Sequence, residues 1–265
     1  MMQALTPGAA GLLVLSVWLT AQAAGAESRG VVPIPAGSYT PFQRVKAVGA
    51  GEPGPLASKP MAAFGLDAEP VTNAEFLAFV ALHPEWRKSR VKALFVDGRY
   101  LRRWSADLEL ADATDRDAPV TDVSWFAAEA FCKAQGLKLP TTEQWEYALA
   151  DAGREQASTR ARSLDWFSEP NGTGPGPIGG PANGYGVRDM VGLVWEWTYD
   201  FNAYATTDES RDPNGKDNAA VCGGAAAGVS DPTDYPAFMR YAMRASLKAI
   251  YTAENLGFRC AGGEP

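Results

Sequence analysis

The side chains that could bind a transition metal or act as a nucleophile are few in this chain. Its 265 residues include one histidine, His83, and three cysteines, Cys132, Cys222 and Cys260. One histidine excludes a zinc site built on several histidines, the iron site of two histidines and one carboxylate, and a histidine relay. Three cysteines exclude a zinc or iron–sulfur centre held by four thiolates. His83 has no identifiable nucleophile to activate, so we do not expect it to act as a general base.

Two carboxylates, Glu143 and Glu146, lie on one expected helix in the segment TTEQWEYALA. Paired carboxylates can do acid–base chemistry. A simpler interpretation is favoured, in which Glu143 is stabilised by the helix dipole and Glu146 pairs with an arginine.

Cationic side chains gather between Trp86 and Trp104, against the acidic character of the whole chain. They are Arg87, Lys88, Arg90, Lys92, Arg99, Arg102 and Arg103. Within this stretch, LFVDGRYL predicts a β-hairpin that turns at Asp97-Gly98. The stretch is either an anion-recognising face or a solvated strand pair, and the second interpretation is favoured.

The overall charge argues against nucleic acid as a partner. The net charge is −7, the pI is about 4.9, and no long Lys/Arg tract is present. The composition, 46% hydrophobic and 21% charged, is that of a globular protein with one large domain or two small ones.

The first residues resemble an export signal. An uncharged apolar run from Gly8 to Ala21 is followed by AQAAGAES, and small residues fit cleavage after Ala23 or, preferably, Ala26. We therefore expect a signal peptide over 1–26 and one domain over 27–265, periplasmic or secreted, with no membrane anchor after cleavage. No Lys or Arg precedes the run, and an uncleaved anchor or a buried N-terminal segment is the alternative.

Three helices that could position these residues are predicted from their capping signals. Thr72 with Glu75 and Thr141 with Gln144 form capping boxes, and Ser124 is a helix N-cap. The expected ends are His83, Gly136 and Gly153. A first strand is expected in VVPIPAGSYTPF. Beyond Glu155 the chain is rich in Gly, Pro, Asn and aromatic residues, so cross-links, metals or buried aromatics must help to hold it.

Four segments together resemble the formylglycine-generating-enzyme, or sulfatase-modifying factor, family. They are EPVTNAEFLAFV, APVTDVSWFAAEAFCKAQGLKLPTTEQWEYALA, NGYGVRDMVGLVWEWTYDF and ENLGFRCA. The resemblance runs from about Val32 to Ala261 and implies an α+β fold with a C-type-lectin-like core and little regular secondary structure. Exported members of the family include sulfatase activators, a pyoverdine-maturation enzyme and relatives found beside nitrite-reductase genes.

The resemblance also shows where this chain departs from the family's best-known chemistry. Formylglycine generators carry two cysteines shortly after a Gly-Gly-Ser segment, and these bind copper(I) as thiolates. Here the matching Gly223-Gly224 is followed by no cysteine as far as Arg244. Copper(I) prefers thiolate or thioether ligands, so we expect no copper site.

The resemblance implies a disulfide between Cys132 and Cys260. Cys222 then has no partner. It could be a nucleophile, a redox site or a metal ligand, but a small buried residue beside Gly223 is favoured.

The segment RDMVGLVWEW resembles a calcium-binding loop of the family. The resemblance implies side-chain ligands from Asp189 and Glu196, and carbonyl ligands from Gly192 and Val194. A hard cation takes such mixed oxygen ligands. Leu193 replaces the family's usual asparagine, and ordinary salt bridges of the two carboxylates are the alternative.

Two functions remain open. The first is an accessory or maturation factor that binds or acts on an exported protein or peptide, in particular a periplasmic redox protein. The alternative is an oxidoreductase that uses a noncysteine site on such a substrate. A pocket is expected between the Cys222–Arg244 segment and the ENLGF strand, with Cys222, Trp195, Arg244 and Asn255 as candidates. The tryptophans are expected in the core rather than in a pocket. They are Trp125, Trp145, Trp195 and Trp197.

Overall fold

The computed structural model describes most of the chain that the resemblance covers. The described ranges are 30–42, 57–154, 156–168, 174–203 and 234–262. The expected signal peptide over 1–26 and the candidate Cys222 lie outside them. Within these ranges, no helix has the length and apolar character needed to cross a membrane.

One antiparallel sheet joins the beginning of the described chain to its end. Strand β4 (Phe64–Asp67) lies between β1 (Val31–Ile34) and β9 (Ala261–Gly262). Leu66 of β4 pairs with Val32 and Ala261 and is fully buried. The first strand expected from the sequence is therefore confirmed.

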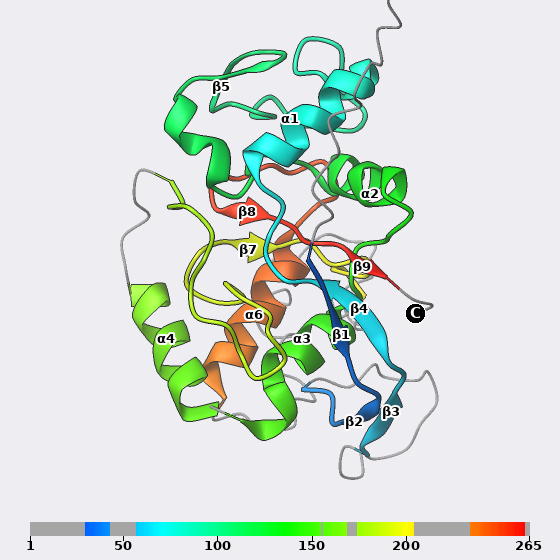
Figure 1. Ribbon diagram of the computed structural model, residues 1–265, viewed down its shortest axis with the longest axis vertical. Coiled ribbons are helices and arrows are strands. Elements are labelled where there is room, and N and C mark those ends of the chain that lie inside the picture. Colours follow the sequence, from blue (N-terminus) through cyan, green and yellow to red (C-terminus); the bar gives the residue numbers. More distant parts are fainter. Residues whose placement is uncertain (1–29, 43–56, 155, 169–173, 204–233, 263–265) are drawn as a thin grey trace, which may run out of the picture.

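The other sheets have two short strands each. Strands β2 (Gly37–Tyr39) and β3 (Lys59–Met61) are antiparallel, as are β5 (Trp104–Ala106) and β6 (Glu109–Leu110). Strands β7 (Trp195–Glu196) and β8 (Leu256–Gly257) are parallel. These small, scattered sheets and the helices between them confirm the predicted α+β fold with little regular structure (Figure 1).

The three helices predicted from capping signals are present. They are α1 (Asn73–Leu82), α2 (Trp125–Ala134) and α3 (Thr142–Ala150), with Thr72, Ser124 and Thr141 as N-caps. Both predicted capping boxes form. Helix α3 ends before Gly153, because Asp151 already adopts a left-handed conformation and a 3₁₀ turn, Asp151–Gly153, follows.

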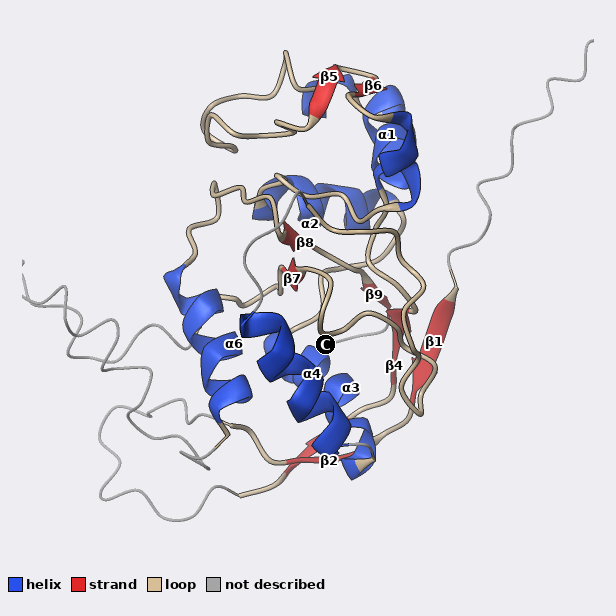
Figure 2. Cartoon of the chain, turned by 90° about the vertical axis from the view of Figure 1, so that its left-hand side faces the viewer, coloured by secondary structure: helices blue, strands red, loops and turns tan. Residues whose placement is uncertain are grey.

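Two further helices lie in the part of the chain that was expected to have few periodic runs. They are α4 (Gln156–Ser168) and α6 (Tyr235–Ser246). The Asp234 side chain accepts a hydrogen bond from the Ala237 N–H at the start of α6, where Pro236 suits the first turn. In Figure 2 these two helices lie beside α3, whereas α1, β5 and β6 form the opposite end of the molecule.

The hairpin predicted at Asp97-Gly98 is wrong. Residues 93–95 and 98–103 form turns, and the only hairpin near them is β5–β6. The Asp97 carboxylate accepts hydrogen bonds from the Arg99 N–H and from both the N–H and the hydroxyl of Thr252. This side chain therefore ties the turn to a distant segment, and Leu101 beyond it is fully buried in the core.

A disulfide joins Cys132 of α2 to Cys260, directly before β9, as the family resemblance implies. Both cysteines are fully buried in the larger hydrophobic core, which also contains Phe76, Phe131 and Phe258. The bridge closes a separation of 128 residues. It ties α2, in the middle of the chain, to the segment before β9, where regular sheet pairing is short.

Candidate functional site

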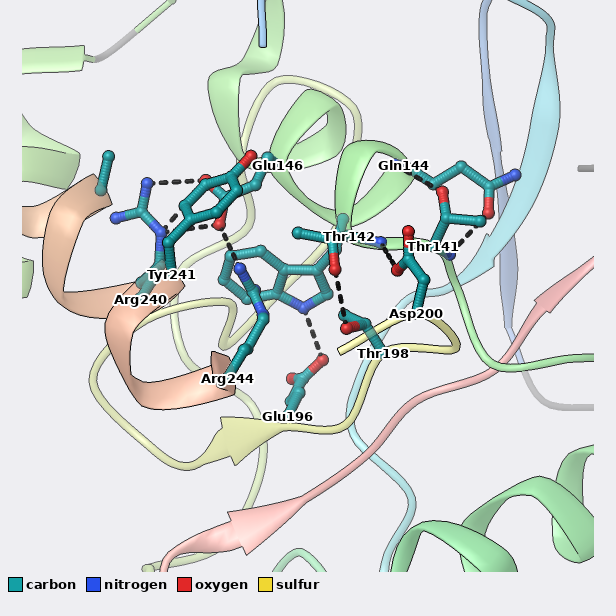
Figure 3. A network of polar contacts seen from close by, with 12 residues as sticks. Thr141, Thr142, Gln144, Glu146, Glu196, Thr198, Asp200, Arg240, Tyr241 and Arg244 are labelled. Carbon is teal, nitrogen blue, oxygen red and sulfur yellow. Dashed lines mark hydrogen bonds and ion pairs between the residues drawn. The ribbon is translucent and has the colours of Figure 1, made fainter. Parts of the chain in front are cut away.

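An ion cluster of one glutamate and two arginines connects α3 to α6. Arg240 and Arg244 lie one helical turn apart on α6 and both face Glu146 of α3 (Figure 3). Arg240 donates from Nε at 3.0 Å and from Nη2 at 2.7 Å, and Arg244 donates from Nη1 at 2.6 Å. The expectation that Glu146 pairs with an arginine is confirmed.

The cluster keeps Glu146 ionised. Burial by itself raises the pKa of this carboxyl, but the guanidinium groups of Arg240 and Arg244 outweigh it, and the pKa lies below its usual value. Burial by itself lowers the pKa of Arg240, but the charge and hydrogen bonds of Glu146 outweigh burial, and the pKa lies above its usual value. A carboxylate fixed by two cations is a poor proton donor at neutral pH, so Glu146 organises the site and does not serve as its acid.

An aromatic pocket lies on one side of the cluster. Trp145, Trp166 and Trp195 line it together with Met243 and Arg244. The Trp166 and Trp195 ring centroids are 4.7 Å apart, and the Arg244 guanidinium lies 4.6 Å from the centroid of the Trp145 ring. The free volume is about 10 Å³, which is room for about one water molecule.

A larger polar cavity lies on the other side, between β2, α3, α4 and α6. Its volume is about 550 Å³. Tyr39, Glu146, Thr159, Ser163 and Arg240 contribute polar atoms to its wall. Because Arg240 borders both this cavity and the aromatic pocket, the ion cluster forms the partition between them.

Three of the four predicted pocket residues are neighbours in the structure. Trp195 and Arg244 both line the aromatic pocket. The backbone N–H of Trp195 donates to the backbone carbonyl of Asn255 at 2.8 Å. Asn255 thus holds β7 in place through its backbone and is not among the residues that line the pocket. The fourth, Cys222, falls outside the described residues.

The expectation that the tryptophans belong to the core is confirmed for Trp145 and Trp197, which are buried. Trp197 donates its indole N–H to the Val123 carbonyl. Trp125 and Trp195 are half-buried and pack against the larger core. Trp145 and Trp195 also line the aromatic pocket, which the expectation did not include. The sequence also did not single out Arg240 or Trp166 for this site. The spacing of Arg240 four residues before Arg244 is a signal that would have found the first.

The two carboxylates of the implied calcium loop are engaged by N–H donors. Glu196 accepts from Arg259 at 2.7 and 2.8 Å and from the Trp145 indole at 2.8 Å, and it is buried. Asp189 accepts from the backbone N–H groups of Gly179 and Gly180, each at 2.9 Å.

The carboxylate oxygens that accept these hydrogen bonds are the ones that the resemblance assigns to a calcium ion. No group of three or more acidic, histidine or cysteine side chains is placed to hold a metal ion among the residues that the structure describes. Gly192 has a φ of +94°, which only glycine adopts easily, and Val194 is buried. The loop is therefore explained by its own hydrogen bonds, and calcium binding by Asp189, Gly192, Val194 and Glu196 stays a prediction.

The comparisons with known proteins decide the family. The family model described as "Sulfatase-modifying factor enzyme 1-like domain" matches residues 19–263. The chain belongs to this family. Its members differ in activity, so membership by itself does not fix the reaction.

Two relatives show this difference. The chain is 30% identical to a formylglycine-generating enzyme of Streptomyces coelicolor, over 88% of this chain and 89% of the enzyme. It is 27% identical to the inactive Cα-formylglycine-generating enzyme 2 of Bos taurus, over 79% of this chain and 80% of that protein.

A solved structure supports the fold. The structure of PvdO from Pseudomonas aeruginosa matches with a TM-score of 0.53 and 20% identity, over 88% of this chain and 93% of PvdO. At this identity the likeness concerns the fold alone.

Proposed function

We propose that this family member is an exported accessory or maturation factor that binds an exported protein or peptide and does not generate formylglycine with copper. The observation that carries the proposal is the number of available thiols. The chain has three cysteines, and two of them, Cys132 and Cys260, form the buried disulfide. Only Cys222 is left, and a copper(I) site of two thiolates cannot be formed by one cysteine.

The polar cavity supports a binding role. Its volume of about 550 Å³ lies within the range of roughly 300–1,000 Å³ typical of ligand sites. The wall includes the hydroxyl-bearing residues Tyr39, Thr159 and Ser163 and the arginine Arg240, so it carries polar side chains of both donor and acceptor character. Backbone amides of an extended peptide require such mixed partners, and a binding partner that is a segment of an exported protein fits this wall.

The charge of the cavity wall also fits a peptide. Arg240 is largely neutralised by Glu146, and Arg160 lies 3.7 Å from Asp234. Because the positive and negative charges at the wall are paired, a ligand without a strong net charge can bind there. The periplasm, and within it a redox protein that needs maturation, is the setting that the N-terminal sequence and the family resemblance favour.

An oxidoreductase acting without cysteine is the alternative. It is favoured by the aromatic pocket, where Trp195 and Arg244 lie beside Trp145 and Trp166. A substrate would have to reach a pocket that now has room for about one water molecule, so opening of this pocket would be required.

The test of the proposal is a reaction with a sulfatase-type cysteine peptide. Purified protein is supplied with copper(I) and oxygen, and copper content, oxygen uptake and peptide aldehyde are measured. The formylglycine-generating enzyme of Streptomyces coelicolor serves as the positive control. We expect no stoichiometric copper and no aldehyde, while aldehyde formation by this protein would overturn the proposal.

Binding is tested separately with a tagged protein expressed in its own host. Thr159→Trp places a large ring at the wall of the polar cavity from a half-buried position. Ser105→Trp adds the same ring at an exposed position on β5, outside the cavity, and is the matched control. An exported protein that the wild type and Ser105→Trp retain and Thr159→Trp loses is the expected result. Equal retention by the wild type and both variants would argue against the cavity.

A further inference from the structure

A row of five aromatic rings runs across the domain outside the candidate site. Neighbouring ring centroids are 5.9, 5.3, 5.5 and 6.0 Å apart. In spatial order the rings belong to Trp86, Phe95, Phe126, Trp125 and Tyr199. We call this set the aromatic row. None of its members lines the aromatic pocket or the polar cavity.

The aromatic row reaches the surface. Tyr199 is 52% exposed, and the other four rings are partly exposed. Leu94, next to Phe95, is 74% exposed. Trp86, Phe95 and Trp125 also pack against the larger hydrophobic core, so only part of each is accessible. Together with the exposed Tyr199 and Leu94 they bring accessible apolar groups to one set of neighbouring residues, and apolar groups gathered in this way mark interaction sites.

Cationic groups accompany the row. Seven lysine or arginine residues and two acidic residues lie between Pro84 and Trp104, so this segment carries +5 while the whole chain carries −7. The remainder of the chain therefore carries −12. An acidic partner is repelled by most of the protein and attracted to this segment.

The structure separates the cations that serve the fold from those that do not. Arg87 donates to the backbone carbonyls of Val80 and Ala81. Lys88 donates to the backbone carbonyl of Trp104. Two more form ion pairs, Arg102 with Glu254 and Arg103 with Asp115.

The other three cations are available. Arg90, Lys92 and Arg99 are exposed, and none of them forms an ion pair with a residue that the structure describes. All three lie within five residues of Phe95 in the sequence, so their charges belong to the same stretch of chain as the first rings of the aromatic row. Exposed cations without an ion pair can meet acidic groups of a bound molecule.

We infer that the aromatic row and the exposed cations Arg90, Lys92 and Arg99 form a docking surface for an acidic protein segment that carries apolar side chains. The rings supply the area that leucine or phenylalanine side chains bury. The cations meet aspartate or glutamate at the edge of the contact, where charge governs the association rate and specificity. This docking surface is separate from the polar cavity and does not depend on the proposed function.

The ring geometry favours a peptide over a sugar. The planes of neighbouring rings differ by 46°, 63°, 85° and 50° along the row. Such tilted and edge-on rings do not present one flat face, whereas a sugar ring stacks best on a flat ring face.

The probe for the docking surface is a fluorescein-labelled synthetic peptide with aspartate, leucine and phenylalanine in a glycine–serine background. Its binding to the full protein is followed by fluorescence anisotropy at low and at physiological salt. One comparison peptide has lysine in place of aspartate, and another has serine in place of leucine and phenylalanine. We expect the acidic apolar peptide to bind more tightly than either comparison peptide, and its affinity to fall as salt screens the charges.

Charge-reversal variants locate the binding. Arg90→Glu with Lys92→Glu should weaken binding roughly tenfold, because two attractions become repulsions at the surface. Leu94→Asp should weaken it as well. Lys138→Glu reverses an exposed charge elsewhere and is the matched control, with an expected change below about twofold. All four positions are exposed, and melting temperatures confirm that each variant folds.

Three results would overturn the inference. The first is equal binding of the acidic and the basic peptide. The second is an equal loss of binding in Lys138→Glu and in Arg90→Glu with Lys92→Glu. The third is displacement of the peptide by a neutral cello-oligosaccharide, which would assign the row to sugars. Thr159→Trp should leave peptide binding unchanged, so failure of the docking surface and failure of the proposed cavity are distinguishable.

Discussion

Cys132 of α2 is bonded to Cys260 across 128 residues of sequence, with both side chains fully buried. The bond consumes two of the three thiols in the chain. It also fixes the chain end that forms β8 and β9 against the first half of the domain. The bond therefore stabilises the fold, and it leaves Cys222 as the one remaining thiol, fewer than the two thiolates that the copper(I) site of the family uses.

Replacing both bridge cysteines by alanine should destabilise the protein. The chain-entropy model assigns about 4–5 kcal/mol to a loop of this length. Denaturant unfolding under nonreducing conditions measures the loss. Reduction of the wild type should produce a similar loss, whereas Cys222→Ser should leave the free energy of unfolding within about 0.5 kcal/mol of the wild type. An equally large loss in Cys222→Ser would contradict the assignment of the bridge.

Replacing Glu146 by glutamine should cost about 3–5 kcal/mol, because Arg240 and Arg244 are left buried without their counter-charge. Glu143→Gln on the same helix is the matched control. Glu143 forms an ion pair with Lys59, with Lys59 Nζ 3.0 Å from Glu143 Oε1. This pair is partly exposed and should contribute at most about 1 kcal/mol to the free energy of unfolding. Equal effects of the two substitutions in urea unfolding would show that the ion cluster does not stabilise the domain.

The same cluster predicts an acid limit to stability. The pKa of Glu146 in the folded protein lies below its usual value, although burial opposes this, because two guanidinium groups hold the ionised form. Its stabilisation is therefore complete above the unfolded glutamate pKa of about 4.3 and is lost as the pH falls through the lower folded pKa. Thermal unfolding between neutral and strongly acidic pH should show this loss in the wild type and not in Glu146→Gln.

Asp122 should behave in the opposite way. Its carboxylate is fully buried, and the nearest cation is Arg102 with Nε at 3.9 Å. Neither carboxylate oxygen accepts a hydrogen bond from a described residue, and burial raises the pKa. Its contribution to stability is therefore largest below the unfolded aspartate pKa of about 3.9 and falls as the pH rises through the higher folded pKa.

Asp122→Asn tests this behaviour. The backbone φ at Asp122 is +55°, which asparagine tolerates. The variant should melt at a higher temperature than the wild type at pH 7, and the difference should vanish in strong acid. Asp107→Asn is a control of opposite sign, because hydrogen bonds from Ser89 lower the pKa of this exposed carboxyl. A variant of Asp122 that melts lower at pH 7 would contradict the prediction.

The calcium prediction has its own test. If the loop binds calcium, the ion raises the melting temperature of the wild type, a chelator reverses the rise, and Asp189→Ala abolishes the response. Asp189→Ala also removes the acceptor for Gly179 and Gly180, so some loss of stability is expected without calcium. A wild-type melting temperature that a chelator leaves unchanged would contradict the calcium site.

The elements that were predictable from the sequence are those with local signals. Thr72, Ser124 and Thr141 cap their helices through side chains that bond within three residues, so the pattern is visible in a short window. The turn at Asp97 was misjudged because its carboxylate bonds to Thr252, 155 residues away. No local pattern predicts that contact.

The candidate site was only partly predictable for the same reason. Arg240 and Arg244 of α6 are polar residues in a segment expected to lack periodic structure, and they become buried only because Glu146 lies opposite them. The family resemblance supplied Trp195, Arg244 and Asn255, but not Arg240 or the cavity that it borders. The division of the site by an ion cluster follows from the tertiary structure alone.

The measurement that tests the central claim most directly is oxygen uptake coupled to aldehyde formation on a cysteine peptide, with the number of free thiols counted in the same copper(I)-treated sample. We expect one alkylatable thiol, on Cys222, no stoichiometric copper, no aldehyde, and no more oxygen uptake than the peptide shows without the protein. Stoichiometric copper with aldehyde formation would contradict this expectation, because that reaction needs two thiolates and the disulfide between Cys132 and Cys260 leaves only Cys222.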